Sequence, residues 1–577
     1  MNERIITGIA ASSGIQIGTS FHYGLHPDER VVDREAAVPE TQIDEELAKL
    51  AAAKALVMGD LQAILERNQD RLDDKQKGII IGHQGLLNDP VFTGDMETVI
   101  RKHRLTAEAA ALRVMEKFVK LFESMDKDYM KERAQDIRDI GGRMLDALQG
   151  KERQTLSAMK EGAILIAHDI SPSDTMEINP QSILGFVTQI GGKTSHTSIL
   201  ARSMGIPAIV GVGPAIKKIP HGVPIIIDGE AGICIVHPEE ATMETYRAKK
   251  RTLIAESGKL EAFRRLPART VDGATFELAA NISSVQDSHQ AVDGGAEGVG
   301  LFRTEFMYMN ATKMPSEQEQ FEVYKEIASM WDGKPVVIRT LDVGGDKKLP
   351  YLSLENEANP FLGYRAIRIG LNQPEVLRTQ LRAIMRASAY GKLRIMFPMI
   401  SSIEEWRQAR AVVADIGHEL EAECIDYDRT IQVGIMAEIP SVIQIADLFA
   451  KEVDFFSIGT NDLTQYTLAV DRMNEKVAYL YDYFHPSVLR SIQTLIRAAH
   501  AEGKRVGMCG DMAGDPLAAP VLVGFGLDEC SMESAALNRM KSVIAKLNRK
   551  DCEEFAQQLL NGSTAQDIRE KLKVFMS

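Results

Sequence analysis

A histidine lies at the start of an expected helix, directly after a glycine turn. Residues 183–187 are mostly apolar and predict a β-strand. Gly191 and Gly192 then predict a turn, and residues 195–202 predict the start of a helix. Backbone N–H groups point outward at such a place and favour bound anions. His196 could therefore take part in chemistry on a bound phosphate. Packing of the histidine under a loop explains its presence equally well, and the local motif does not distinguish these two roles.

The C-terminal half places cations and carboxylates at or near the ends of expected strands. Guanidinium groups bind phosphate and carboxylate oxygens through paired hydrogen bonds, so several of them can clamp a small, multiply charged anion. Two carboxylates beside a bound phosphate are a usual arrangement for Mg²⁺. This combination predicts phosphoryl transfer, in which positioning and charge neutralisation supply most of the catalysis. The cations are Arg303, Arg339, Lys347, Arg365 and Arg472, and the carboxylates are Glu438 and Asp462.

A cysteine and a long connection complete this group. Cys509 ends another expected strand, and its thiol could deliver or remove a proton at a carbon atom. Taken alone, however, such a cysteine is more often an inert buried thiol. The connection over 343–365 contains Lys347 and Arg365, and we expect it to close as a lid that brings both cations to the substrate.

Eight strand-like runs, each followed by a helical stretch, predict the element that positions these residues. Eight βα units in about 300 residues are typical of a (β/α)8 barrel, whose active site lies at the C-terminal ends of its strands. A barrel core does not need charged residues at those ends, so a purely structural role explains them poorly. The runs cover residues 276–281, 298–303, 336–339, 393–398, 433–438, 455–459, 505–509 and 527–532.

The N-terminal half predicts an α/β module that a helical block interrupts. Helix formers dominate between residues 38 and 148, with apolar residues at helical spacing. A charged helix over 239–265 shows little apolar surface and suits a linker between modules that move. Strand patterns occupy residues 5–23, 163–167, 183–187, 206–210 and 224–228.

Length, charge and cysteine content limit the classes of protein. A chain of 577 residues exceeds one core and predicts two to four domains. The net charge of −14 argues against nucleic acid as a main partner and favours a basic protein. The five cysteines are scattered without a CxxC pair, so we expect reduced thiols in a cytoplasmic protein. No apolar run approaches the length of a membrane span, and no signal-peptide pattern opens the chain, so we expect no membrane insertion.

Three motifs resemble those of a known family. Residues 191–199, GGKTSHTSI, resemble the phosphohistidine signature of the phosphoenolpyruvate-utilising enzymes. Residues 454–466, DFFSIGTNDLTQY, resemble the second signature of that family, at its substrate and metal site. Together with residues 295–306, GAEGVGLFRTEF, they make the whole chain very similar to enzyme I of the bacterial phosphoenolpyruvate:sugar phosphotransferase system.

This resemblance implies two phosphoryl transfers and a role for each site residue. Phosphoenolpyruvate would phosphorylate His196 in the presence of Mg²⁺ and release pyruvate, and the group would then pass to a histidine of the phosphocarrier protein HPr, the first step of sugar uptake. Thr175 would support His196 by a hydrogen bond, and Cys509 would donate a proton to the enolate. Glu438 and Asp462 would bind Mg²⁺. The implied substrate-binding residues are Arg303, Arg339, Asn461, Arg472, Lys347 and Arg365.

The resemblance also implies a multidomain α/β protein with four parts. Residues 1–30 and 150–236 would form a swivelling α/β phosphohistidine domain, and residues 31–149 an inserted all-helical subdomain that binds HPr. Residues 237–265 would form a linker helix. Residues 266–577 would form the (β/α)8 barrel that binds phosphoenolpyruvate and makes a homodimer. Because His196 and the barrel lie in different parts, we expect the phosphohistidine domain to swing between the barrel and HPr.

Three positions depart from the usual residues of the family, and one rival function is disfavoured. Lys193 replaces an arginine, Asp511 a glutamate and Ala437 a larger apolar residue, which leaves anion contacts from 193 and 511 open. A phosphoenolpyruvate synthase or pyruvate, phosphate dikinase would need an ATP-binding domain before the phosphohistidine module. Fewer than 200 residues precede His196, and no GxxxxGK loop is present.

Overall fold

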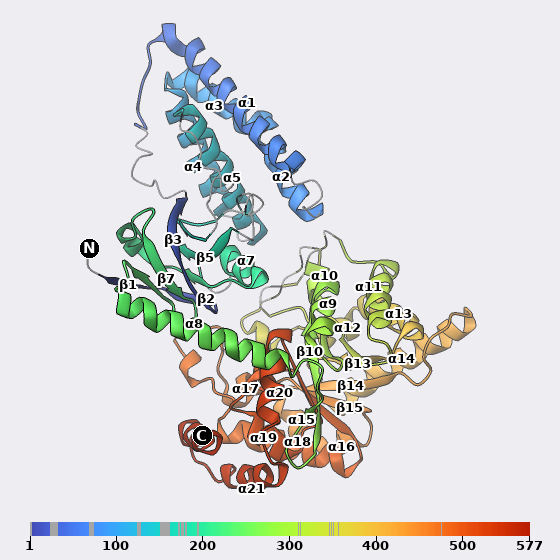
Figure 1. The fold of residues 1–577 in the computed structure, drawn as a ribbon. Helices are drawn as coiled ribbons and strands as arrows, with labels where there is room; N and C mark the ends of the chain where they lie inside the picture. Colours follow the sequence, from blue (N-terminus) through green and yellow to red (C-terminus); the bar gives the residue numbers. More distant parts are fainter. Residues whose placement is uncertain are drawn as a thin grey trace. The chain divides into compact units, whose positions relative to one another are not determined.

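The computed structural model divides into two compact units, Met1–Ala255 and Glu256–Ser577, which we describe separately (Figure 1). The described residues are 3–23, 33–67, 74–123, 128–150, 162–170, 174, 178, 182–192, 195–309, 311, 313–345, 347, 349, 351–352, 354–355, 357–474 and 476–577. Among them, no helix is both long enough and apolar enough to cross a membrane.

The first unit contains an eight-stranded mixed sheet in the order β1-β8-β7-β3-β4-β5-β6-β2. Its central strands β3 to β6 are parallel, and isoleucine-rich clusters cover both faces, so β4 and β7 are nearly continuous apolar runs. Strand β8 was absent from our predictions. The strands are β1 (Arg4–Thr7), β2 (Ile9–Ser12), β3 (Ile15–Tyr23), β4 (Ala163–Ala167), β5 (Ile183–Thr188), β6 (Ala208–Val210), β7 (Pro224–Asp228) and β8 (Ile233–Val236).

The chain leaves this sheet after β3 and returns at β4, its direct neighbour, so the helices between them are an insertion. Their shared core includes the fully buried Leu61, Met96 and Ile140. Glu46 of the first helix accepts a hydrogen bond of 2.8 Å from the backbone N–H of Ala107 and so ties two helices together. The helices are α1 (Ile43–Arg67), α2 (Asp74–Asn88), α3 (Pro90–His103), α4 (Ala107–Glu123) and α5 (Asp128–Leu148).

Helix α8 (Glu240–Glu261) continues from the first unit into the second along the chain. Met243, Tyr246 and Leu253 pack against a cluster of sheet residues that contains Ile15 and Ile226. The expectation that this helix has little apolar surface was therefore wrong for its first turns. The three side chains are spaced three and seven residues apart and are surrounded by charged residues. They form a narrow apolar stripe, which is difficult to recognise in the sequence.

The second unit is a closed barrel of eight parallel strands, β10 to β17, in which β10 also pairs with β11. This confirms the predicted (β/α)8 fold. A short strand, β9 (Ala268–Arg269), pairs antiparallel with β10 and was not predicted. The barrel strands are β10 (Thr275–Ile282), β11 (Val299–Arg303), β12 (Val336–Arg339), β13 (Leu393–Phe397), β14 (Gln432–Ala437), β15 (Phe455–Ile458), β16 (Arg505–Met508) and β17 (Glu529–Met532).

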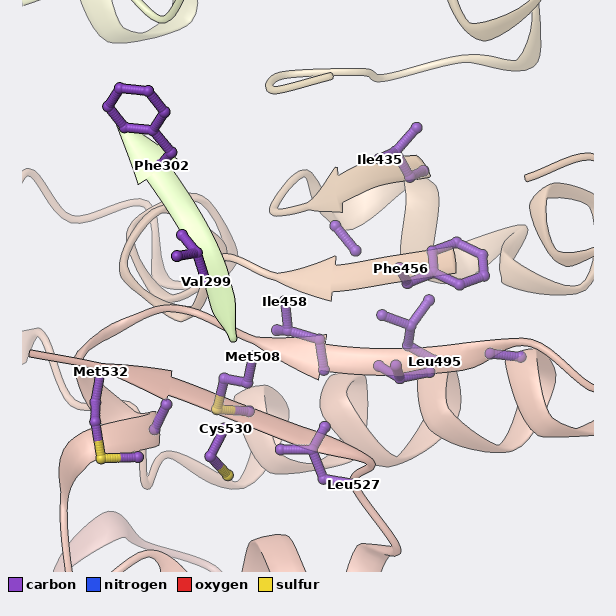
Figure 2. Packing of buried hydrophobic residues seen from close by; sticks show 14 of the residues in the cluster. Val299, Phe302, Ile435, Phe456, Ile458, Leu495, Met508, Leu527, Cys530 and Met532 are labelled. Carbon is purple, nitrogen blue, oxygen red and sulfur yellow. The ribbon is translucent and has the colours of Figure 1, made fainter. Parts of the chain in front are cut away.

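Side chains alternate between the two faces of the barrel wall. Phe456, Ile458 and Met508 face outward into the large core shared with helices such as α18 (Figure 2). Their neighbours Phe455 and Cys509 belong to a separate, small inward cluster. The other helices of this unit are α9 (Val285–Gly294), α10 (Glu305–Met309), α11 (Glu317–Met330), α12 (Ile367–Asn372), α13 (Pro374–Ala387), α14 (Ile403–Ala422), α15 (Pro440–Gln444), α16 (Ala446–Ala450), α17 (Thr460–Leu468), α18 (Pro486–Ala501), α19 (Ala519–Phe525), α20 (Leu537–Ile544), α21 (Arg549–Leu559) and α22 (Ala565–Met576).

Candidate active site

Helix α7 (His196–Met204) begins at His196, as the sequence predicted. Ser195 is its N-cap, and the Ser195 hydroxyl accepts a hydrogen bond from the backbone N–H of Ser198 at 3.4 Å. The Ser198 hydroxyl in turn donates to the carbonyl of Gly192 at 2.7 Å, which closes the turn onto the helix. The His196 side chain and residues Lys193 and Thr175 lie outside what the structure describes.

A buried network of charges forms at the mouth of the barrel, beginning with Arg339 at the end of β12. Its Nη2 lies 2.5 Å from Oε1 of Glu305, and its Nη1 lies 3.2 Å from Oδ2 of Asp342. Lys347 Nζ lies 2.8 Å from the same Glu305 oxygen. One carboxylate therefore holds a guanidinium and an ammonium side by side.

Arg365 extends the network toward the predicted metal carboxylates. Its Nη2 lies 3.0 Å from Oδ1 of Asp342 and 3.3 Å from Oδ2 of Asp462. Its Nη1 donates a hydrogen bond of 3.1 Å to the Tyr466 hydroxyl. Arg472 is more distant, with Nη2 at 3.9 Å from Oδ1 of Asp462. The connection over 343–365 thus places both of its cations in the mouth, whereas its closure as a lid stays a prediction.

These contacts fix the charge states of the cluster. Burial acts to raise the pKa of Asp342, but Arg339, Arg365 and Lys347 hold it below its usual range. Burial works against the charge of Arg339, and the neighbouring carboxylates outweigh it and raise its pKa. Arg339 and Asp342 are therefore both ionised at neutral pH.

Several polar atoms of the mouth remain available to a ligand. Among the described residues, none hydrogen-bonds to Nε of Arg339, Nε of Arg365, Oε2 of Glu305 or Oγ1 of Thr460, although all four atoms are buried. Buried polar groups are rarely left without a partner in a finished structure. A polar, charged ligand would supply the partners that these atoms lack.

Arg303 and Asn461 have other partners. Arg303 ends β11 directly opposite Arg339 in the register, but its Nη2 lies 3.0 Å from Oε1 of the exposed Glu533. Oδ1 of Asn461 accepts a hydrogen bond of 2.8 Å from the backbone N–H of Asp511. This contact uses the backbone of residue 511, so the aspartate found there in place of glutamate leaves it unchanged.

Glu438 and Asp462 form a pair of close acidic groups. Glu438 is 2% exposed, and its Oε1 accepts a hydrogen bond of 2.6 Å from the N–H of Met399. Burial, followed by the negative charges of Asp462 and Asp342, raises the pKa of Glu438 to about 8. A cation bound between the two carboxylates would relieve this repulsion.

The thiol of Cys509 lies at the C-terminal end of β16 and is 6% exposed. Burial raises its pKa to about 11, although the Ser457 hydroxyl and Arg339 act in the opposite direction. The thiol is therefore protonated at neutral pH, which is the form a proton donor needs.

Comparisons with known proteins cover the whole architecture. Models of the phosphoenolpyruvate-utilising enzymes match residues 7–133 (N-terminal), 159–232 (mobile domain) and 257–549 (PEP-binding domain). A phosphoenolpyruvate-protein phosphotransferase of Priestia megaterium is 46% identical over 570 residues, covering 98% of each chain. The chain belongs to the phosphoenolpyruvate-protein phosphotransferase family. The resemblance predicted from the sequence is thereby confirmed.

Other members of the phosphoenolpyruvate-protein phosphotransferase family match at a similar level. The Geobacillus stearothermophilus protein is 44% identical over 568 residues, covering 98% of this chain and 97% of its own. A solution structure of an Enzyme I protein is 36% identical and covers 43% of this chain and 99% of its own, with a TM-score of 0.38.

Sequence reasoning missed two central residues of this phosphotransferase, Glu305 and Asp342. Glu305 opens α10 two residues after Arg303, and Asp342 follows β12 by three residues. Both lie at C-terminal strand ends, where a barrel places functional side chains, and that position was the signal available. These carboxylates do not bind an anion themselves but hold the cations that do, so a search for anion-binding side chains does not find them.

Glu438 and Asp462, the two carboxylates predicted to bind metal in this phosphotransferase, fit Mg²⁺. Both offer hard oxygen ligands, and Mg²⁺ is usually held by one or two carboxylates together with water and substrate phosphate oxygens. Among the described residues, no group of three or more His, Cys, Asp or Glu side chains could hold a metal ion by itself. The metal would therefore need oxygens from the substrate.

Proposed function

We propose that this chain transfers the phosphoryl group of phosphoenolpyruvate to its own His196, releases pyruvate, and then passes the group to a histidine of HPr. The observation that carries the proposal is the buried cluster of Arg339, Lys347 and Arg365, in which both guanidinium Nε–H groups have no partner among the described residues. A small molecule with a phosphate and a carboxylate matches this number of cations.

The substrate-binding residues divide into a deep and an outer set. Arg339 and Arg365 are buried and held on carboxylates, so they suit the fixed orientation that in-line transfer requires. Arg303 and Arg472 are one-third exposed, at 33% and 35% of their side chains, so they suit capture and charge neutralisation at the rim. Asn461 would contact the phosphate.

Glu438 and Asp462 would hold Mg²⁺, which neutralises phosphate charge and stabilises the enolate oxygen when bound. Glu438 is held in place by the N–H of Met399, and Asp462 by Arg365. Cys509 would protonate the enolate carbon from the neighbouring strand end. Its position directly after β16, beside the end of β15 that leads to Asp462, supports this assignment.

His196 would carry the phosphoryl group between two partners. Its position at the N-terminus of α7 supports the assignment, because free backbone N–H groups there favour a phosphate. Thr175 would support the histidine. HPr would dock on α1 to α5, where Leu56 and Ile81 are exposed apolar side chains, and the barrel unit would form the homodimer.

Pyruvate release measured with and without HPr tests this function. Without HPr, the chain should release one pyruvate per protein molecule and then stop, because His196 stays phosphorylated. Excess HPr should convert this single burst into continuous release, and removal of Mg²⁺ with a chelator should abolish both.

Two variants provide the controls. His196→Ala should release no pyruvate while still binding phosphoenolpyruvate, because the barrel mouth is intact. His168→Ala changes a histidine of the same unit that pairs with Gln189, and it should behave as the native chain does. Continuous pyruvate release by His196→Ala would contradict the proposal.

A further inference from the structure

A column of polar side chains runs down the inside of the barrel from Cys509, and the proposed reaction does not use it. Along β16 and the residue that follows it, Arg505, Gly507 and Cys509 alternate onto the inward face. Gly507 pairs in register with Ser457 of β15 on one side and with Glu529 of β17 on the other. Ser457 and Glu529 therefore face each other across a residue without a side chain.

A small cavity lies in this column. It has a volume of about 10 Å³, about the space of one water molecule. Gly300 and Gly507 make room for Glu529: a Cβ at position 300 would collide with its Oε1, and one at 507 would lie 3.2 Å from it. The lining residues include Ser457, Glu529, Arg394, Arg505 and both glycines.

Glu529 is buried in this cavity and has no fixed partner in the described part of the chain. It is 7% exposed, and no described residue is hydrogen-bonded to its carboxylate or pairs with it within 4 Å. The charged groups that face it are Glu277, Arg394, Arg505 and Asp528. Burial and Glu277 raise the pKa of Glu529 to about 7, against the opposing effect of the two arginines. A carboxyl group at this position can both hold and release a proton near neutral pH.

Ser457 connects Glu529 with the thiol. The Ser457 hydroxyl is buried without a hydrogen-bond partner among the described residues, lines the cavity, and lies close enough to Cys509 to lower the pKa of its thiol. At the other end, Arg505 is 51% exposed and pairs with Glu277, so the base of the column reaches solvent.

We propose that Glu529 returns a proton to Cys509 through the Ser457 hydroxyl and one water molecule in the cavity. The inference rests on the proposed role of Cys509 as proton donor. After the Cys509 S–H bond breaks and its proton forms a C–H bond with the enolate, a thiolate remains. Ser457 gives its hydroxyl proton to the sulfur, the water gives a proton to Ser457, and the Glu529 carboxyl gives one to the water. The Glu529 carboxylate then takes a proton from solvent at the barrel base.

The direction of this proton transfer, from the Glu529 carboxyl group to the Cys509 thiolate, agrees with the environments of the two groups. Burial holds the thiol pKa at about 11 and the carboxyl pKa at about 7, so a proton moves from Glu529 to a Cys509 thiolate spontaneously. Glu529 touches neither the substrate nor the reacting carbon in this scheme. It is a positioning residue that supplies a proton through Ser457.

A comparison of the first turnover with later turnovers tests the relay in the full chain, with phosphoenolpyruvate, Mg²⁺ and excess HPr. The first turnover uses the proton that Cys509 already carries, so Glu529→Gln should leave its rate within about twofold of native. Each later turnover needs a new proton, so the steady-state rate should fall at least tenfold and its pH dependence near pH 7 should disappear. Ser457→Ala should show the same split between the two phases.

Controls separate the relay from structural damage and from the role of Cys509. Cys530→Ala, on the opposite face of β17 (Figure 2), should change neither phase. If Glu529→Gln fails to fold, Ser457→Ala alone decides the question. Two results with folded Glu529→Gln and Ser457→Ala would overturn the relay: a native steady-state rate, or an equal loss of rate in the first turnover and in the steady state. A native first turnover in Cys509→Ala would instead remove Cys509 from the reaction.

Discussion

At the scale of single residues, Glu305 and Asp342 set the geometry of the barrel mouth. Both are buried, and Glu305 contacts two cations and Asp342 three, so the guanidinium groups of Arg339 and Arg365 are oriented by the protein itself. Fixed charges of this kind need little rearrangement when the reaction proceeds. The cost is that removing either carboxylate leaves buried positive charge uncompensated.

Asp342→Asn should lower the free energy of unfolding of the barrel by about 3 kcal/mol, because a buried ion pair loses one partner. Phosphoenolpyruvate should restore part of the loss, since its negative charges neutralise Arg339 and Arg365. Thermal unfolding with and without phosphoenolpyruvate measures both effects. Glu452→Gln removes an ion pair with the exposed Arg407 and should change the melting temperature little. Equal melting temperatures for both variants would contradict this account.

Glu529 makes stability depend on pH. Its pKa is raised to about 7 in the fold, so the folded state favours the protonated form. Its stabilising contribution is present at low pH, below the pKa of the unfolded chain, and is lost as the pH rises toward 7. As the pH rises from 5 to 8, the native chain should therefore lose about 1–3 kcal/mol of stability relative to Glu529→Gln. Urea unfolding at the two pH values measures this difference, and a constant difference would contradict the buried, uncompensated carboxylate.

At the scale of elements, strands that belong to a repeating sequence pattern were predictable, whereas isolated strands and contacts between connections were not. All eight barrel strands were predicted, because short, largely apolar runs recur along this half of the chain and a helical stretch follows each of them, and β7 was predicted with its observed bounds. Strands β8 and β9 were missed, since β9 has only two residues and β8 directly follows a turn. The ion-pair network at the mouth joins residues from several connections, and their distances depend on the closed barrel.

The N-cap of α7 offers a test of the helix that carries His196. Ser195→Ala should cost about 1 kcal/mol of stability, because the N–H of Ser198 loses its acceptor. Ser195→Asp should keep the stability, since aspartate also caps helices, but should slow the phosphorylation of His196 through charge repulsion. Chemical unfolding and single-turnover phosphorylation separate the two effects. Equal phosphorylation rates in the two variants would argue against a phosphate at this helix start.

At the scale of the whole molecule, the reacting groups belong to two separate units. His196 lies in Met1–Ala255 and the cationic mouth in Glu256–Ser577, and α8 is the connection that continues across the division. Gly258 lies in α8 just beyond this division, and a Cβ added there would meet no atom within 4 Å. A glycine inside a helix weakens it by about 1 kcal/mol, so α8 should bend there more easily than elsewhere.

Gly258→Ala should therefore slow the overall transfer from phosphoenolpyruvate to HPr by about fourfold, because bending α8 then costs nearly 1 kcal/mol more. The affinity for phosphoenolpyruvate should not change. Gly294→Ala in α9, a helical glycine of the barrel unit where an added Cβ would make only ordinary van der Waals contacts, serves as the control and should leave the rate unchanged. A native transfer rate in Gly258→Ala would mean that motion at this point does not limit the reaction.

The fate of the phosphoryl group shows whether His196 carries it from phosphoenolpyruvate to HPr. The full chain should be incubated with phosphoenolpyruvate labelled in its phosphate and with Mg²⁺, and the labelled residue should then be identified. We expect one acid-labile label per chain, located on His196, absent from His196→Ala and lost when HPr is added. Label that persists in His196→Ala, or that HPr does not remove, would contradict this role of His196.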